Sequence, residues 1–327
     1  MEINTAAEKV LAGDRAALAR SITLVESENP NHTTQGQALL NQLLPHVKPT
    51  IRIGISGSPG VGKSTFIENL GLRLLKEDLR VAVLAVDPSS PMSGGSIMGD
   101  KTRMNELAKD KRAFIRPSPS GGYLGGVARR TREAMLICEA AGFDVVIVET
   151  VGVGQSEVDV SNMVDTFVLL LHPGAGDELQ GVKRGVLEIS DIVVVHKSDG
   201  SFMNLAKKTK AAYESSLSLF RPRSEQWPVT PVLMASSLEN EGLGNVWNTI
   251  LSHHDVMERH GLLAQKRALQ AQTWMWSIVN DELGRRFKNH EAIKHELEQV
   301  SSSVQRQQVS PTHGALSLIE KFFGATS

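Results

Sequence analysis

The sequence predicts an α/β fold in which helices flank a mostly parallel sheet. Six short apolar runs rich in β-branched residues recur between about residues 50 and 254, and longer helical segments separate them. The runs are apolar throughout rather than alternating, which is typical of strands that are buried on both faces. A glycine-rich motif directly follows the first run. We therefore expect strands at residues 51–55, 81–86, 144–149, 166–171, 191–195 and 229–234.

Size and composition are those of a globular protein of about two domains. The chain has 327 residues, is 41% apolar and carries a formal net charge of −1. The near-neutral charge argues against nucleic acid or an anionic membrane as a main partner. No signal-peptide pattern and no membrane-spanning run are expected. The one cysteine, Cys138, lies among apolar neighbours, so we expect a buried thiol and a reducing, cytoplasmic location.

Both ends of the chain are predicted to be helical. Residues 1–48 are expected to form an N-terminal helical extension, with a loop at residues 27–36. Residues 49–254 form the expected α/β domain, and residues 255–327 form an amphipathic C-terminal arm. The apolar side chains of Trp274, Met275 and Trp276 either pack on the α/β domain or form a dimer contact. We expect the arm to be the dimerisation element.

The strongest motif is GSPGVGKST at residues 57–65, which fits the phosphate-binding pattern G-x-x-x-x-G-K-[ST]. It follows a predicted strand and precedes a predicted helix, as this pattern requires. Glycines let the backbone N–H groups face phosphate oxygens, and the helix N-terminus favours an anion. The motif therefore predicts a P-loop nucleoside triphosphatase fold. Its predicted nucleotide-binding residues are Gly57, Ser58, Pro59, Gly60, Val61, Gly62, Lys63, Ser64 and Thr65.

Acidic side chains at the ends of predicted strands are candidate Mg²⁺ ligands beside the Ser64 hydroxyl. Asp87 and Glu149 each end an apolar run, where a carboxylate faces the ligand crevice of an open α/β sheet. Asp100, in a glycine-rich stretch, is either a metal ligand or a helix cap. Gln155 either orients the attacking water or is an exposed loop residue. We expect Lys63, Glu149 and Gln155 to be the catalytic residues.

The stretch VVVHKSDG at residues 193–200 nearly matches the guanine-reading motif Asn-Lys-x-Asp, with His196 in place of asparagine. Lys197 and Asp199 are retained, and the aspartate is the group that selects guanine by accepting two hydrogen bonds from it. Because His196 still offers one N–H donor, we expect guanine preference with weaker affinity and a pH dependence near 6–7. A second base-binding loop is predicted at Ser236, Ser237 and Leu238.

Longer blocks of the sequence resemble one known family. GSPGVGKST, AVDPSSPMSGGSIMGDKTRM, FIRPSPSGGYLGG, CEAAGFDVVIVETVGVGQSE and GAGDELQGVKRG are similar to the P-loop GTPases that accompany methylmalonyl-CoA mutase, the MeaB, MMAA and ArgK group. The resemblance is close over roughly residues 50–250 and looser at the helical ends. It implies a homodimeric GTPase chaperone with helical arms. Such a protein binds an adenosylcobalamin-dependent mutase, gates its cofactor loading and protects it from inactivation.

The resemblance also assigns residues. It implies that Ser64, Asp87, Asp100 and Glu149 surround Mg²⁺, and that Asp177 and Lys183 belong to a mobile switch. The family has a Ser-Ala pair where this chain has Ser236 and Ser237. Three other functions stay open: an ATP-dependent kinase or transport ATPase of the older ArgK type, a nucleotide-dependent scaffold without hydrolysis, and a metallochaperone GTPase. Retained Asp199 argues against the first, and the absence of a His or Cys cluster motif argues against the third.

Overall fold

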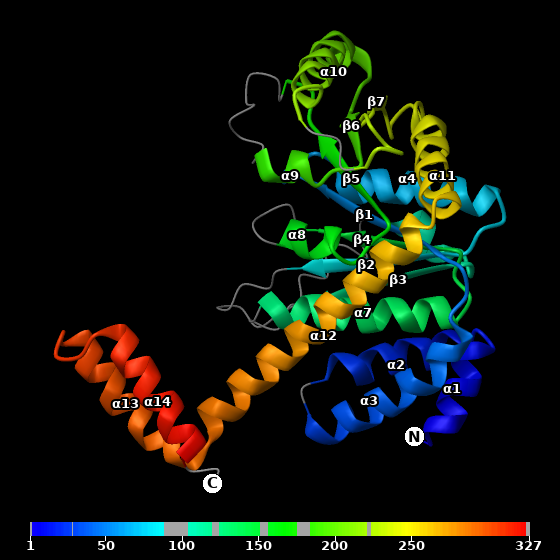
Figure 1. Cartoon of the computed structure of the whole chain (residues 1–327). Helices are drawn as coiled ribbons and strands as arrows, with labels where there is room; N and C mark the ends of the chain where they lie inside the picture. The colour runs from blue at the N-terminus through cyan, green and yellow to red at the C-terminus, as the bar shows by residue number, and fades with distance from the viewer. Residues whose placement is uncertain are drawn as a thin grey trace. The chain divides into compact units, whose positions relative to one another are not determined.

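Parallel strands form one sheet at the centre of the chain (Figure 1). The computed structural model describes residues 2–27, 29–87, 104–119, 124–150, 156–174, 184–220 and 224–324. The order of the seven strands within these residues is β3-β2-β4-β1-β5-β6-β7, and each neighbouring pair is parallel. The predicted fold class is confirmed. The strands are β1 (Ile51–Gly57), β2 (Val81–Asp87), β3 (Ala113–Pro119), β4 (Val145–Glu149), β5 (Thr166–Leu171), β6 (Ile192–His196) and β7 (Val232–Ala235).

Helices cover both faces of the sheet, with α4 and α11 on one side and α7 on the other (Figure 1). The helices around the sheet are α4 (Lys63–Lys76), α6 (Asn105–Lys109), α7 (Leu124–Ala140), α8 (Ser156–Ser161), α9 (Arg184–Glu188), α10 (Met203–Leu217) and α11 (Leu243–Arg259). Short 3₁₀ turns occur at Leu44–His46 and Gly200–Phe202. The helices towards the termini are α1 (Ile3–Leu11), α2 (Arg15–Glu26), α3 (Pro30–Leu43), α12 (Leu262–Asn289), α13 (Glu291–Gln305) and α14 (Pro311–Gly324).

Burial on both faces explains why the strands are apolar throughout. In β2, Val81 and Val83 join the core beneath α4 and α11, whereas Ala82 and Leu84 join the core beneath α7. All four side chains are fully buried. β2 therefore contributes alternate residues to two separate cores, as β4, β5 and β6 also do, and these strands are apolar throughout the buried run.

Two strands differ from the prediction: β3 was not predicted, and β7 begins later than expected. The β3 segment AFIRPSP contains Pro117 and Pro119, which a central strand rarely tolerates because proline has no N–H. β3 lies at the edge of the sheet, where proline is acceptable. The expected strand at 229–234 begins only at Val232, because Pro231 precedes it and offers only its carbonyl, which accepts the N–H of Val193 (2.9 Å).

The predicted loop at residues 27–36 is wrong from Pro30 onward, because α3 begins there. The Asn29 side chain accepts the Asn31 N–H (2.9 Å), and Pro30 takes the first helical position, where its missing N–H costs nothing. The first turns of α3 carry exposed polar residues, which hid the helix from a composition argument. The three N-terminal helices pack on one another and on α7.

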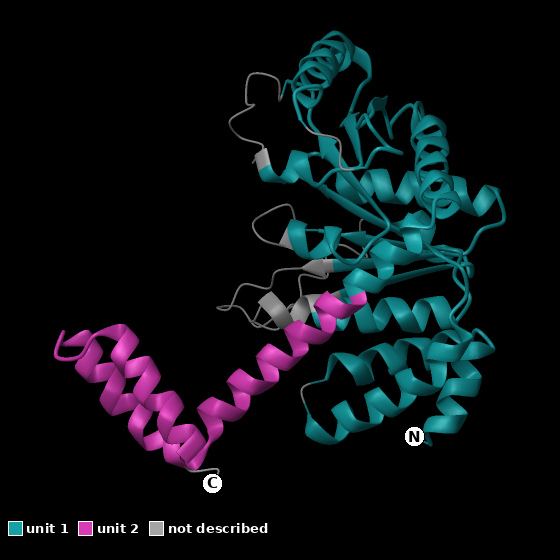
Figure 2. Cartoon of the chain, viewed as in Figure 1, with its two compact units in different colours: residues 1–270 teal, residues 271–327 magenta. Residues whose placement is uncertain are grey.

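The chain divides into two compact units, residues 1–270 and 271–327 (Figure 2). The division falls within α12. The boundary predicted at residues 48/49 lies between the first 3₁₀ turn and β1, and the boundary predicted at 254/255 lies inside α11. The N-terminal helices belong to the same unit as the sheet. The functions assigned to the three predicted segments stay predictions.

The described residues agree with two simpler expectations. Cys138 is fully buried in α7, as predicted, and burial raises the pKa of its thiol. Within the described ranges, no helix is both long enough and apolar enough to cross a membrane.

Candidate nucleotide-binding site

The phosphate loop connects the end of β1 to the start of α4. Gly57 and Gly62 are both in backbone conformations with positive φ, at 154° and 95°. A Cβ on Gly57 would lie 2.6 Å from the carbonyl oxygen of Leu170 in neighbouring β5, so only glycine fits there. The loop delivers the chain to α4, whose first turn has backbone N–H groups without intrahelical partners. The predicted loop, residues 57–65, thus forms a concave backbone segment at a helix N-terminus, which is a favourable anion site.

Lys63 is held inside this loop. Its side chain is only 8% exposed, and its Nζ donates to the carbonyl oxygens of Gly57 (2.7 Å) and Ser58 (3.3 Å). These two contacts therefore hold the ammonium group against the backbone of the loop. A phosphate oxygen that entered the loop would meet a positioned cation rather than a mobile one.

Two predicted metal ligands are in direct contact. The Ser64 hydroxyl, at the start of α4, donates to Glu149 Oε1 (3.2 Å), at the end of β4. Strand register explains the meeting, because Glu149 pairs with Ile55 on neighbouring β1 just before the phosphate loop. Both donors are hard oxygens, as Mg²⁺ prefers, and octahedral bonds of about 2.0–2.1 Å place adjacent ligands roughly 3 Å apart. The two side chains therefore fit a shared magnesium site.

The other predicted metal, catalytic and switch residues are only partly described. Asp87 is the last residue of β2, and Ala85 of the same strand pairs with Glu149. The backbone of Asp87 therefore lies at the same carboxyl end of the strands as Glu149. The side chain of Asp87 is outside the described parts. Asp100, Gln155, Asp177 and Lys183 also lie outside the described residues.

The base-reading residues lie where β6 and β7 end. The backbone of Lys197 adopts φ = 58°, which is unusual for a residue other than glycine. Its Nζ donates to the carbonyl of Gly60 in the phosphate loop (2.8 Å). The hydroxyl of Ser236 donates to Asp199 Oδ2 and also accepts the N–H of Glu239 (3.1 Å). The Asp199 carboxylate is thereby fixed between the two predicted base loops.

His196 does not point towards solvent from the base loop. Its imidazole is 2% exposed, with Nδ1 2.7 Å from the Val61 carbonyl oxygen and Nε2 2.8 Å from the Ser237 hydroxyl. Phe66 of α4 contacts the ring edge-on at 5.5 Å between centroids. The structure therefore joins His196 to both the phosphate loop and the second base loop. Sequence reasoning gave it one hydrogen bond to the base or to a carbonyl, and missed Val61 and Ser237 as its partners.

The second base loop is closed by a pair of backbone hydrogen bonds between Ser236 and Glu241 (2.9 and 3.0 Å). Ser236 and Ser237 are buried beneath it. Leu238 behaves differently, because its side chain is 81% exposed. Any contact of Leu238 with a nucleotide therefore comes from its exposed surface or its backbone.

Gly62 is expected to tolerate no side chain because His196 lies directly against it. A Cβ there would lie 2.9 Å from His196 Cε1, in addition to the strain of the positive φ. Gly60 has a similar φ of 81° but open space around its Cβ position. We expect Gly62→Ala to lower the stability of the nucleotide-free chain by more than the roughly 1–3 kcal/mol of backbone strain that Gly60→Ala incurs. Thermal unfolding of both variants measures this, and equal losses would contradict the close approach of His196.

Burial lowers the pKa of His196 below 6.5, its ordinary value, and the charges of Lys197 and His172 act in the same direction. The Val61 carbonyl and Asp199 oppose this shift. The pH dependence predicted near 6–7 therefore moves to lower pH. Because the unfolded chain binds this proton more readily, stability is fully present above about pH 6.5 and falls as the pH drops towards the folded-state pKa.

We therefore expect the melting temperature to fall between pH 7.5 and 5.5, and to fall less in His196→Asn. Each unit by which the pKa is lowered corresponds to about 1.4 kcal/mol. Nucleotide affinity of the unmodified chain should be flat between about pH 6.5 and 8. An identical pH response in His196→Asn would show that other groups cause it.

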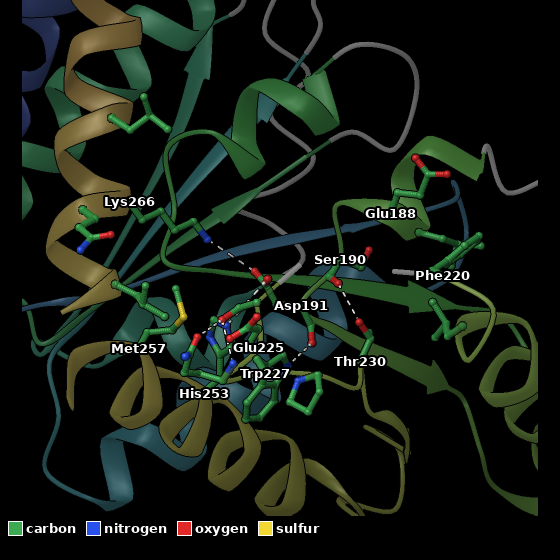
Figure 3. Close-up of a pocket in the computed structure, with 18 of the residues that line it drawn as sticks. Glu188, Ser190, Asp191, Phe220, Glu225, Trp227, Thr230, His253, Met257 and Lys266 are labelled. Atoms are coloured by element: carbon green, nitrogen blue, oxygen red, sulfur yellow. Dashed lines mark hydrogen bonds and ion pairs between the residues drawn. The ribbon is translucent and has the colours of Figure 1, made fainter. Parts of the chain in front are cut away.

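A cavity of about 860 Å³ opens where β6 and β7 begin, at the other end of these strands from the base-reading residues (Figure 3). Asp191 lies in it and accepts the N–H of Phe167 (2.8 Å), with Lys266 Nζ at 3.7 Å and His253 Nε2 at 3.8 Å. These polar groups lie close to one another, while Trp227, Phe220 and several leucines form apolar walls. The mixed lining selects no single class of ligand, and the cavity is separate from the phosphate loop.

Comparison with known proteins identifies the family of the chain. Residues 18–292 match the family described as methylmalonyl Co-A mutase-associated GTPase MeaB. The chain is 45% identical over 308 residues to the Escherichia coli protein named GTPase ArgK, covering 94% of this chain and 93% of that one. It is 46% identical over 323 residues to the mouse methylmalonic aciduria type A homolog, mitochondrial, covering 96% and 78%.

The solved structure of an LAO/AO transport system kinase superposes with a TM-score of 0.79 at 37% identity, covering 97% of this chain and 96% of that one. The fold therefore has a counterpart along nearly the whole chain. On the family match and on these identities, the chain belongs to the MeaB family of methylmalonyl-CoA mutase-associated P-loop GTPases.

Proposed function

We propose that the chain is a GTP-binding and GTP-hydrolysing chaperone that gates cofactor loading and protects an adenosylcobalamin-dependent methylmalonyl-CoA mutase. The observation that carries the nucleotide part is that Lys197 donates to Gly60 of the phosphate loop while Ser236 donates to the Asp199 carboxylate, two residues further along the chain. The mutase part rests on the family description and on relatives such as the methylmalonic aciduria type A homolog. The cytoplasmic location stays a prediction from the single cysteine.

Each described residue has a distinct part in the proposed hydrolysis. The Asp199 carboxylate accepts hydrogen bonds from the guanine edge, and Ser236 fixes the orientation of that carboxylate. Lys63 transfers its ammonium donors from the loop carbonyls to the β- and γ-phosphate oxygens. Ser64 and Glu149, with Asp87 and Asp100 proposed beside them, would hold Mg²⁺. The ion would supply positive charge to offset the charge that develops on the phosphates. Gln155 is proposed to orient the attacking water.

Self-association is proposed through the C-terminal arm. Trp276 and Leu283 of α12, both in the smaller compact unit, are exposed by 55% and 58%, and they lie seven residues apart along the helix. A heptad stripe of large apolar side chains is typical of helices that pair with another helix. This favours a dimer contact for Met275 and Trp276 over the alternative, which was packing on the α/β domain. The switch residues Asp177 and Lys183 are proposed to transmit the nucleotide state to the mutase.

Turnover with and without the partner tests the proposal. We would measure GTP hydrolysis by the full chain alone and with purified adenosylcobalamin-dependent methylmalonyl-CoA mutase, using Glu149→Gln as the inactive control. A rise in turnover that requires the mutase and is absent in Glu149→Gln supports the chaperone. Turnover that ignores the mutase contradicts the partner. No hydrolysis under either condition leaves a binding scaffold, and preferred use of ATP supports the kinase or transport ATPase.

Sedimentation tests the proposed dimer separately. We expect the unmodified chain to sediment as a dimer and Trp276→Asp to sediment as a monomer, because a carboxylate would interrupt the apolar stripe. Glu320→Ala, which changes an exposed side chain of α14, serves as the control. A dimer that survives Trp276→Asp unchanged would place the interface elsewhere.

A further inference from the structure

Two residues of the base-reading loops contact each other although they are far apart in sequence. His196 ends β6 and Ser237 follows β7, and the His196 Nε2 lies 2.8 Å from the Ser237 hydroxyl oxygen. Both are departures from the expected letters of their motifs, asparagine at 196 and alanine at 237. Their side chains are 2% and 7% exposed, so neither has ready access to water as a substitute partner.

The hydrogen bonds fix the tautomer of His196. The Val61 carbonyl oxygen is only an acceptor, so His196 Nδ1, at 2.7 Å, must carry the proton. In the neutral ring Nε2 is then an acceptor, and the Ser237 hydroxyl must donate to it. Only one arrangement satisfies both contacts of the neutral ring. The Ser237 hydroxyl donates to His196 Nε2, and His196 Nδ1–H donates to the Val61 carbonyl in the phosphate loop.

The surroundings hold the imidazole in this orientation. Gly62 lies against one edge of the ring, where a Cβ would come within 2.9 Å of Cε1. Phe66 packs on the ring edge-on from α4. The backbone N–H of Ser198 also donates to the Ala235 carbonyl (3.2 Å), which joins the two base loops just beside the pair. The ring therefore cannot turn away without losing contacts on the phosphate loop, α4 and the second base loop together.

We propose that His196 and Ser237 are a coupled pair of positioning residues that sets guanine selectivity by fixing the Ser237 backbone against the phosphate loop. The pair does not contact the base through its side chains, because both ring nitrogens and the hydroxyl proton are already used. It acts through the Ser237 N–H, which the fixed loop presents to the guanine carbonyl oxygen. Adenine carries an amino group at that position, so a correctly placed N–H donor favours guanine and opposes adenine. The inference rests on the proposed guanine site.

The pairing predicts a specific pattern among variants. Ser237→Ala leaves the buried Nε2 acceptor of His196 without a donor, and His196→Asn leaves the buried Ser237 hydroxyl without its acceptor. Each single change should therefore reduce guanine selectivity, since an unsatisfied buried polar group disturbs the loop that contains it. The double change removes the imidazole and the hydroxyl together and restores the asparagine and alanine of the two motifs, and neighbouring substitutions of this kind are commonly non-additive. Ser237→Thr keeps the hydroxyl and should keep the selectivity.

A double-mutant cycle on the full chain tests this. We would measure the affinities of Mg²⁺-GDP and Mg²⁺-ADP for the unmodified chain, His196→Asn, Ser237→Ala, the double variant and Ser237→Thr. The ratio of the two affinities is the readout, because a merely structural loss would lower both affinities alike. We expect each single variant to lose about 5- to 100-fold in this ratio. The double variant should lose less than the more damaged single variant, and Ser237→Thr should stay near the unmodified chain.

The outcomes are separable. An unmodified chain that binds ADP as tightly as GDP would overturn the proposed guanine site itself. Clear GDP preference in the unmodified chain, with single losses that multiply in the double variant, would retain that site and overturn the pairing. Unchanged selectivity in Ser237→Ala would also overturn it. Thermal unfolding of every variant without nucleotide identifies any that fail to fold; for such a variant, Ser237→Cys, which keeps a weak donor of similar size, replaces Ser237→Ala in the cycle and should show an intermediate loss.

Discussion

Replacement of Lys63 with alanine is expected to weaken GTP binding by about 10- to 100-fold, which is the effect of losing a hydrogen-bonding charged partner. Turnover should fall by about 10²–10³-fold, as when one preorganised donor is removed from a reacting centre. The reason is the position of the ammonium group, which is buried in the phosphate loop 2.7 Å from the Gly57 carbonyl. Calorimetric titration gives the affinity, and phosphate release gives the turnover.

Lys76→Ala is the matched control for Lys63→Ala. Lys76 is the last residue of the same helix α4 and is exposed. Its removal should change neither affinity nor turnover measurably and should alter stability by no more than about 0.5 kcal/mol. Equal nucleotide affinity in Lys63→Ala and Lys76→Ala would mean that the loop does not bind phosphate through Lys63.

Replacement of Asp165 with alanine is expected to destabilise the larger compact unit by about 3–5 kcal/mol. Asp165 is 1% exposed and accepts the Arg52 N–H (2.8 Å) as well as Arg267 Nε (2.9 Å) and Nη2 (2.7 Å). Arg267 Nη2 also donates to the Thr50 carbonyl (2.6 Å). Asp165 thus links the starts of β1 and β5 to the first turns of α12. Removing it leaves a partly buried guanidinium without its carboxylate.

Thermal unfolding measures this loss. At about 2–4 °C per kcal/mol for a unit of this size, the melting temperature should fall by roughly 6–20 °C. Glu8→Ala, an exposed acid in α1 of the same unit, should shift it little. In Asp165→Asn combined with Arg267→Met, where both charges are gone, the loss should be smaller than the sum of the single losses. A small shift in Asp165→Ala would show that the ion pair is dispensable.

Most of the strands that could be predicted have apolar runs that serve two cores. β2, β4, β5 and β6 contribute side chains to both cores, and continuous hydrophobicity is a direct consequence. β1 could be predicted from its isoleucines, of which Ile53 and Ile55 lie in one core. β3 escaped prediction because an edge strand accepts Arg116, Pro117 and Pro119. The start of α3 escaped because its cap, Asn29 followed by Pro30, is a short signal inside a polar segment.

The candidate site also has a part that could be predicted from the sequence and a part that could not. The phosphate loop is a local motif, so its residues could be named from nine consecutive letters. The contact between Ser64 and Glu149 could be anticipated because parallel strands end at one edge of the sheet. The partners of His196 could not, because Val61 and Ser237 lie 135 and 41 residues away and nothing local in the sequence points to them. Only the folded structure shows that His196 is buried and hydrogen-bonded to both the phosphate loop and the second base loop.

The most direct test of guanine recognition is competitive binding of GTP and ATP, each with Mg²⁺, to the full unmodified chain. We expect a clear preference for GTP, because the Asp199 carboxylate remains positioned between the two base loops although His196 replaces asparagine. Asp199→Asn should abolish that preference. Equal or tighter binding of ATP by the unmodified chain would contradict guanine recognition and would favour an ATP-dependent enzyme on the same fold.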